Sequence, residues 1–249
     1  PAAGRGGGGH IGDAASRAPA EKGPAAPASG KSGGAPAVDL PQKIATGEKQ
    51  VVPLTKMRQT IATRLQQSKQ NIPHFYASVD IDCEALVALR EKLNKQLEPQ
   101  KIRLSVSDFV NKAIAVALQQ HPAVNAHFDE KNHQVIRFGD VHLGIAVSLP
   151  DGLIVPVLKS IDQMGLKEIR QRSVDLAERA RAGKLKGNEM TGATFTVSTL
   201  GAYGVREFSA IINPPEVGIL AVGAAEKRPV VVGDQIVAQR GDPLAQGGR

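Results

Sequence analysis

The spacing of apolar residues along the chain predicts helices in four segments. An apolar residue returns every three or four positions in each, which is the period of an amphipathic helix. The four segments are Thr55–Lys69, Glu84–Leu97, Ser107–Gln120 and Leu166–Arg181. Thr55 is expected to cap the first helix, Ile72-Pro73 to end it, and Gly183 to end the last. The third segment is apolar almost all round, so we expect it to be the central, buried helix.

Alternation of apolar and polar residues predicts strands between and after these helices. The segment His74–Asp82 places apolar residues such as Phe75 and Val79 on one face, which is typical of a half-buried strand. Further strands are expected at Gln134–Phe138, Val141–Leu149, Leu153–Leu158, Ala193–Gly201 and in the apolar run that follows Asn213-Pro214-Pro215. Pro150-Asp151-Gly152 is a hairpin turn signal, and Pro156 indicates a sheet edge or a bulge.

The order of these elements does not show the regular strand–helix alternation of a doubly wound sheet. It favours an α+β fold with a mixed sheet covered by helices. Residues 1–46 are rich in Gly, Ala and Pro and poor in large apolar residues, so we expect a disordered linker there. Residues 47–232 are expected to form the ordered core, and residues 233–249 a C-terminal tail of unusual sequence.

The composition limits the function classes. The formal charge is +7, yet no run of Lys and Arg is interleaved with aromatic residues, so we expect no nucleic-acid partner and prefer a phosphate-bearing small molecule. No apolar stretch is long enough to predict a membrane span. The six His residues show no metal-ligand spacing, so no metal site is expected. The one cysteine, Cys83, fits a reducing compartment: the bacterial cytoplasm or the mitochondrial matrix.

A row of hydroxyl groups stands out in the strand expected at Ala193–Gly201. Thr194, Thr196 and Ser198 point to one face of it, just before Gly201. Such a row at the end of a strand can form a site, or it can be a polar face packed against a neighbouring element. The pattern alone leaves both interpretations open.

Several separated motifs, taken together, resemble the catalytic core of the dihydrolipoamide acyltransferases of 2-oxo acid dehydrogenase complexes. The resemblance runs from about Glu48 to Val232, and the acetyltransferases of pyruvate dehydrogenase complexes fit best; succinyl and branched-chain specificities stay open. The motifs are Met57–Ala62, Ile72–Tyr76, Pro150–Val157, Gly192–Gly201 and Ile211–Pro215.

The resemblance implies a fold like that of chloramphenicol acetyltransferase, assembled as homotrimers that build a larger shell. It implies acyl transfer between a lipoyl-lysine thioester and coenzyme A, with the lipoyl group on a separate domain. The 2-oxo acid dehydrogenase component and dihydrolipoamide dehydrogenase are the implied partners. Ser198 is the implied oxyanion donor, and Thr199 departs from the Asn of many members. The channel residues are expected to be His74, Asp151, Gly152, Thr196, Thr199 and Asn213.

One departure from the family pattern concerns the general base. The resemblance implies a His in a D-H-R-x-x-D-G motif near the C-terminus, and none of the His residues in this sequence lies in such a motif. On this ground we expect a C-terminally truncated core without its catalytic His. The alternative hypothesis to an active acyltransferase is therefore an inactive core or scaffold subunit of the same complex.

Overall fold

The computed structural model describes residues 44–248, so most of the expected linker lies outside the described residues. The chain divides into two units, residues 1–51 and residues 52–249. In the first unit the described residues contain one turn, in which the Glu48 N–H donates to the Ala45 carbonyl. The helices and strands that the structure describes lie in the second unit.

The helices lie where the apolar period predicts them. They are α1 (Lys56–Asn71), α2 (Glu84–Leu97), α3 (Val106–Gln120) and α4 (Leu166–Arg181), with short 3₁₀ turns η1 (Glu98–Gln100), η2 (Ile161–Gln163), η3 (Gly187–Glu189) and η4 (Gly201–Tyr203). The Thr55 hydroxyl accepts a hydrogen bond from the Arg58 N–H at 3.3 Å, and Ile72 is the C-cap of α1. The predicted start and end of the first helix are therefore confirmed.

The strands form one large mixed sheet and two small hairpins. The strands are β1 (Phe75–Asp82), β2 (Ala126–Asp129), β3 (Gln134–Arg137), β4 (Leu143–Ile145), β5 (Val147–Leu149), β6 (Gly152–Ile154), β7 (Val157–Leu158), β8 (Phe195–Thr199), β9 (Gly218–Val222), β10 (Glu226–Val232) and β11 (Gln235–Gly248). Within the described residues the large sheet has the order β1-β11-β9-β8-β4-β7, and β10 pairs with β11. Pairs β2–β3 and β5–β6 are separate.

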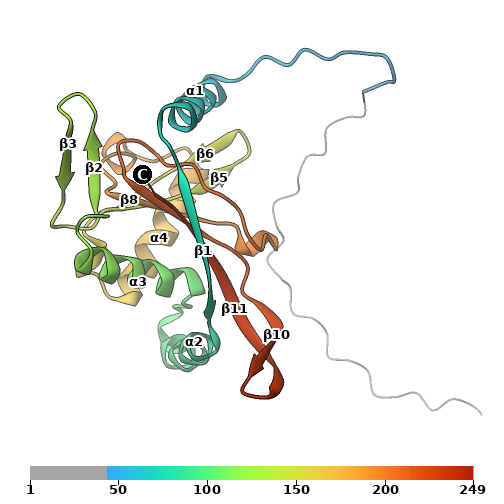
Figure 1. The fold of residues 1–249 in the computed structure, drawn as a ribbon, viewed down its shortest axis with the longest axis vertical. Helices are drawn as coiled ribbons and strands as arrows, with labels where there is room; N and C mark the ends of the chain where they lie inside the picture. The colour runs from blue at the N-terminus through green and yellow to red at the C-terminus, as the bar shows by residue number, and fades with distance from the viewer. Residues whose placement is uncertain (1–43, 249) are drawn as a thin grey trace, which may run out of the picture. The chain divides into compact units, whose positions relative to one another are not determined.

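The large sheet mixes parallel and antiparallel pairing. β8 is parallel to both of its neighbours, β4 and β9, whereas the remaining pairs are antiparallel. Pro156 falls between β6 and β7, and β7 ends the sheet, as the edge signal predicts. The expected α+β class with a mixed sheet and covering helices is confirmed, and Figure 1 shows α3 and α4 on one side of the sheet.

Two apolar clusters hold opposite faces of β8 and β9. The larger packs α3 and α4 on the sheet through Leu118, Leu176, Phe195, Val197 and other buried aliphatic residues. The smaller joins Ile219 and Ala221 to Ile72 and Ile212 on the other face. Because side chains alternate along a strand, the hydroxyl row of β8 shares the face of this smaller cluster. The full burial expected for the third helix is wrong in part, since Val116 is 42% exposed.

The expected half-buried state of β1 is also wrong. All eight of its residues are exposed, including Phe75 at 61% and Val79 at 55%. The reason is position: β1 is an edge strand that pairs with β11 alone. An apolar stripe of this kind left open to solvent is typical of a surface that another chain covers.

A strand also lies where we expected a tail. Residues 235–248 form β11, which pairs with β1 on one side, with β9 on the other, and with β10 along its first half (Figure 1). This stretch holds Gly241, Pro243, Gly247 and Gly248, residue types that are depleted in strands. The stretch forms a strand because it pairs with residues that are distant in the sequence. Local strand propensity does not include such pairing.

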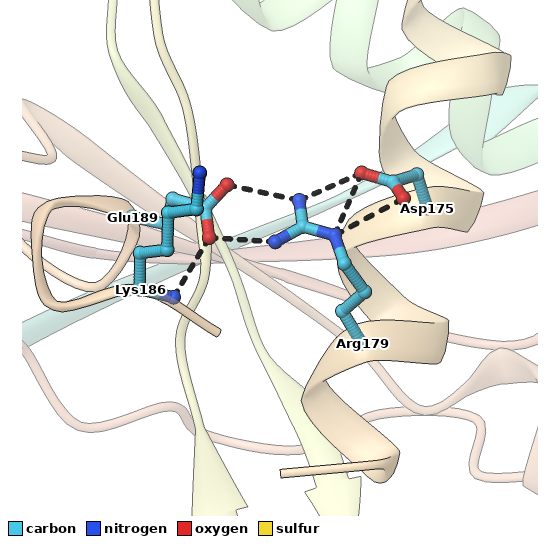
Figure 2. Close-up of polar contacts among 4 residues, drawn as sticks. All are labelled: Asp175, Arg179, Lys186 and Glu189. Atoms are coloured by element: carbon cyan, nitrogen blue, oxygen red, sulfur yellow. Dashed lines mark hydrogen bonds and ion pairs between the residues drawn. The ribbon is translucent and has the colours of Figure 1, made fainter. Parts of the chain in front are cut away.

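An ion network ties η3 to the last turns of α4 (Figure 2). The Arg179 guanidinium donates to both carboxylate oxygens of Asp175 and to both of Glu189, at 2.6–3.0 Å. The Lys186 backbone N–H donates to Glu189 at 2.8 Å. The hydrogen bonds from Arg179, followed by that from Lys186, lower the pKa of Glu189 from 4.5 to about 2.

Because the pKa of Glu189 is lower in the folded protein than in the unfolded chain, its contribution to stability is present above pH 4.5 and is lost as the pH falls toward 2. We therefore expect Glu189→Gln to lower the unfolding midpoint at pH 7, and the difference from the unchanged protein to shrink at pH 3. Denaturant unfolding at the two pH values measures this. An equal difference at both would contradict the ionic character of the contact.

Candidate functional site

Ser198 lies near the carboxyl end of β8, and its hydroxyl group is not engaged in a hydrogen bond with its neighbours. Its neighbours Phe195 and Val197 alternate into the larger apolar cluster, which fixes the strand and turns Ser198 to the opposite face. Ser198 is half-buried, and among residues 44–248 its Oγ has no hydrogen-bond partner. A half-buried, unengaged hydroxyl is able to donate to a ligand.

The other two hydroxyls of the row are engaged in the fold. Thr194 Oγ1 accepts from the His142 N–H at 3.0 Å and donates to the His142 carbonyl at 3.3 Å. Thr196, only 1% exposed, donates to Glu216 Oε2 at 2.6 Å. The two interpretations of the hydroxyl row therefore divide between its members: Thr194 and Thr196 are structural, whereas Ser198 is available.

The chain turns sharply just after Ser198, and the turn requires glycine. A Cβ at Gly201 would lie 2.3 Å from the carbonyl oxygen of Gly223, far inside van der Waals contact. The Leu200 N–H donates to the Val222 carbonyl at 3.1 Å, which holds the turn against the end of β9. This close approach fixes the position of the backbone that carries Ser198.

A cleft of about 940 Å³ opens beside the smaller apolar cluster. Its walls come from the end of α1, the β2–β3 hairpin and residues 213–218. The lining is mixed: Phe128 and Val217 are apolar, whereas Arg64, Glu130 and Asn213 are polar. Of the residues expected to line a substrate channel, Asn213 lines this cleft.

Behind the cleft lies a buried acid that the sequence analysis missed. Glu216 is 2% exposed, and its carboxyl oxygens accept from Thr196 Oγ1 at 2.6 Å and from Asn213 Nδ2 at 3.0 Å. We call these three residues the Glu216 cluster. Burial raises the pKa of Glu216 from 4.5 to about 7, against the smaller lowering effect of the two hydrogen bonds. The only sequence signal was an acid directly before an apolar run, after Pro214-Pro215.

The raised pKa of Glu216 predicts a pH-dependent cost. Between pH 4.5 and 7 the folded protein keeps a proton that the unfolded chain has already lost, so stability falls as the pH rises through this range. The variant Glu216→Gln has no ionisable group at this position. We expect this variant to gain stability relative to the unchanged protein from pH 5 to pH 8, measured by thermal unfolding. A difference that does not change with pH would contradict the buried carboxyl.

His74 joins two segments through both ring nitrogens. The Ile212 N–H donates to its Nε2 at 3.0 Å, so Nδ1 carries the proton and donates to the Ile72 carbonyl at 2.7 Å. Two other histidines also form hydrogen bonds with the backbone. His127 bonds to the Ala193 carbonyl, and His142 accepts from the Ser160 N–H. These contacts give all three histidines structural roles, and His74, although half-buried, is not among the residues that line the cleft.

The remaining candidates do not gather around Ser198. Asp151 lies in the β5–β6 turn and Gly152 begins β6, and Arg58 of α1 donates to the Pro150 and Asp151 carbonyls at 3.2 Å. Gly152 has φ of +151°, and a Cβ there would lie 2.7 Å from Ile61 of α1, which explains the glycine. Thr199 is half-buried but alternates to the face opposite Ser198.

Residues 44–248 show neither a metal cluster nor a membrane-spanning helix. No three His, Cys, Asp or Glu side chains in that range come close enough together to hold a metal ion. None of the helices there has both the length and the apolar character to cross a membrane.

Comparison with known proteins gives consistent matches. Residues 46–245 match the family described as 2-oxoacid dehydrogenases acyltransferase (catalytic domain). The dihydrolipoyllysine-residue acetyltransferase component of the pyruvate dehydrogenase complex of Zymomonas mobilis is 43% identical over 185 residues, which are 74% of this chain and 42% of that protein. The chain thus spans less than half the length of this relative.

Solved structures agree with the sequence matches. The dihydrolipoamide acetyltransferase of Azotobacter vinelandii, studied for the role of a serine, a histidine and an asparagine in its mechanism, has a TM-score of 0.78 and 35% identity. The match covers 84% of this chain and 87% of that one. The cubic core of a pyruvate dehydrogenase multienzyme complex matches with the same TM-score, identity and coverage.

Proposed function

Because this chain belongs to the 2-oxoacid dehydrogenase acyltransferase family, we propose that it transfers an acetyl group between a lipoyl thioester and coenzyme A within such a complex. The lipoyl group and coenzyme A are both substrates, one as the thioester and the other as the free thiol. The lipoyl group is carried on a separate domain. The choice of acetyl rests on the names of relatives such as the Zymomonas protein. The observation that carries the proposal for this fold is the unengaged hydroxyl of Ser198 at the end of β8.

The chemistry needs a donor of this kind. The thiolate of one substrate attacks the thioester carbonyl of the other, and a tetrahedral intermediate forms whose oxygen is negative. The Ser198 hydroxyl donates to this oxygen, and collapse of the intermediate expels the second thiolate, which takes up a proton. A free thiol of pKa about 8.5 is mostly protonated at pH 7, so a general base must remove its proton first. In the family this base is the His of the D-H-R-x-x-D-G motif.

For the walls of the site we keep the channel residues of the resemblance as a proposal. Asn213 has the strongest support, because it lines the cleft. Thr196 is buried with its hydroxyl engaged, so its contribution is to shape the site and not to contact substrate. The remaining channel residues lie away from Ser198 and do not line the cleft: Thr199, His74, Asp151 and Gly152. A neighbouring subunit would have to complete a channel at these positions.

We propose that the protein works as a homotrimer within a larger shell. The exposed apolar stripe of β1 supports an interface with another copy, since large apolar side chains left in water are costly. The relatives named above are a component and a core of pyruvate dehydrogenase complexes. On this basis the proposed partners are the 2-oxo acid dehydrogenase component and dihydrolipoamide dehydrogenase. The proposed location is the bacterial cytoplasm or the mitochondrial matrix.

Acyl specificity offers a direct test. The product of the complete gene is assayed for transfer to dihydrolipoamide from acetyl-CoA, succinyl-CoA and isobutyryl-CoA. We expect the highest kcat/KM with acetyl-CoA. A preference for another acyl group would keep the family and overturn the acetyl assignment. Absence of transfer from all three by the folded protein would favour the scaffold hypothesis.

A further inference from the structure

Glu216 is a buried acid to which the reaction assigns no part. It follows the Pro214-Pro215 pair, immediately before the segment that leads into β9, and it is 2% exposed. Among residues 44–248 no cationic side chain forms an ion pair with it. Burying a carboxyl group destabilises the fold unless its oxygens are hydrogen-bonded. In Glu216 each carboxyl oxygen accepts from one donor.

The two donors come from the two parts of the site. Thr196 precedes Ser198 by two residues on the same face of β8, so whatever fixes Thr196 fixes the strand that carries the unengaged hydroxyl. Asn213 lines the cleft of about 940 Å³. Glu216 therefore connects the Ser198 strand to the wall of the cleft through two hydrogen bonds.

The backbone around Glu216 adds a third attachment. The Val217 N–H donates to the Ala126 carbonyl at 3.2 Å, and the Phe128 N–H donates to the Pro215 carbonyl at 2.9 Å. His127 and Glu216 thus face one another in a β-bridge to β2. The segment that carries Glu216 is anchored on the β2–β3 hairpin, which leaves its carboxyl in a fixed position for Thr196 and Asn213.

We propose that Glu216 is a positioning residue for acyl transfer: by holding Thr196 and Asn213 together it sets the geometry between the Ser198 hydroxyl and the cleft. This inference rests on the function proposed above and deepens it. The role is one of hydrogen-bond geometry. Neither the charge of the carboxyl group nor its contact with substrate is required.

Geometry and charge predict opposite rankings of two substitutions. Glu216→Gln introduces a side chain of the same length: its carbonyl accepts from Asn213, and its amide donates to Thr196 Oγ1, which can accept as well as donate. Glu216→Asp keeps the charge but shortens the side chain by one methylene, so the carboxylate cannot reach both donors. A positioning role predicts an active Gln variant and an impaired Asp variant, whereas an electrostatic role predicts the reverse.

The first experiment measures kcat and KM for acetyl transfer with the complete gene product and the variants Glu216→Gln, Glu216→Asp and Glu216→Ala. A displacement of about 1 Å in a site can cost about 10²-fold in rate. We expect kcat to fall about 10- to 100-fold in the Asp and Ala variants, with KM for coenzyme A within about threefold, and to stay within about threefold in the Gln variant. A folded Ala variant with unchanged kcat, or a Gln variant as slow as the Asp variant, would overturn the proposal.

Strand β8 offers a matched pair of controls. Thr196→Val and Thr194→Val each remove one buried hydroxyl, the first from β8 and the second from the residue directly before it, but only Thr196 contacts Glu216. Both should lower the unfolding temperature. We expect Thr196→Val alone to lower kcat per folded protein. Equal losses of kcat in the two variants would mean that general loosening of β8, and not the Glu216 cluster, is responsible.

Hydrogen exchange separates this inference from the function on which it rests. In Glu216→Asp and Glu216→Ala, backbone amides of residues 195–199 and 213–217 should exchange faster, and in Glu216→Gln they should not. If the unchanged protein transfers no acyl group, the proposed function fails, and the exchange result still decides whether Glu216 holds the two segments. Unchanged exchange in the Ala variant would overturn the inference whatever the activity.

Discussion

Ser198→Ala is expected to lower kcat for acetyl transfer by about 10²- to 10³-fold, which is the usual cost of removing one oxyanion donor. KM should change little, because the hydroxyl acts on the transition state and not on the bound thioester. The fold should be unaffected, since among residues 44–248 the hydroxyl has no partner to lose. Steady-state kinetics with the complete gene product measures the effect.

Ser198→Thr is the matched control, because it keeps a hydroxyl on the same carbon. It should retain more activity than the Ala variant, with a loss that depends on how well the added methyl group fits. An Ala variant with unchanged kcat would show that the hydroxyl is not the oxyanion donor. The hydroxyl row of β8 would then be structural throughout.

Val79→Glu is expected to dissociate the proposed trimer and to abolish acetyl transfer with it. Val79 is 55% exposed in the middle of β1, so a carboxylate there is harmless to the isolated chain. In a dry interface between subunits the same carboxylate would be buried without a partner, which costs several kcal/mol. Sedimentation or light scattering reports the mass, and the transfer assay reports the activity.

Leu89→Glu serves as the comparison for this variant. Leu89 is 47% exposed and lies on α2, not on β1. We expect this variant to keep both mass and activity. A Val79→Glu protein that keeps the mass of the unchanged protein would show that the apolar stripe of β1 is not the interface.

Local patterns predicted the helices and most of the large sheet. The period of α1 and α4, the cap at Thr55 and the break at Pro156 are properties of short sequence windows, and these features were confirmed. The exposure of β1 could not be predicted in this way. Alternation of apolar residues indicates that one face of the strand is buried. It does not indicate whether that face is covered by the same chain or by another.

The strand β11 was missed for a related reason. Its pairs with β1 and β9 join residues far apart in the sequence, and its glycines and Pro243 argue locally against a strand. Long-range pairing overrides such weak local preferences. The hydrophobic pattern therefore found β8, which is rich in β-branched residues, but it gave no expectation of a strand at β2, β10 or β11.

The candidate site was predicted in part. The alternation drew attention to the row of Thr194, Thr196 and Ser198, but the choice of Ser198 came from the family resemblance, and in the structure Ser198 has the one unengaged hydroxyl of that row. The Glu216 cluster was not predictable, since its members Thr196, Asn213 and Glu216 meet only when β8 and the 213–217 segment come together. A single acid before an apolar run does not indicate whether it will be buried or exposed.

The central claim is that this protein catalyses acyl transfer with Ser198 as the oxyanion donor. The decisive measurement is the rate of acetyl-dihydrolipoamide formation when the complete gene product, folded and at its native mass, is mixed with acetyl-CoA and dihydrolipoamide. We predict a rate that saturates with both substrates and falls about 10²-fold or more in Ser198→Ala. A rate no higher than that of acetyl-CoA and dihydrolipoamide mixed without protein would contradict the claim.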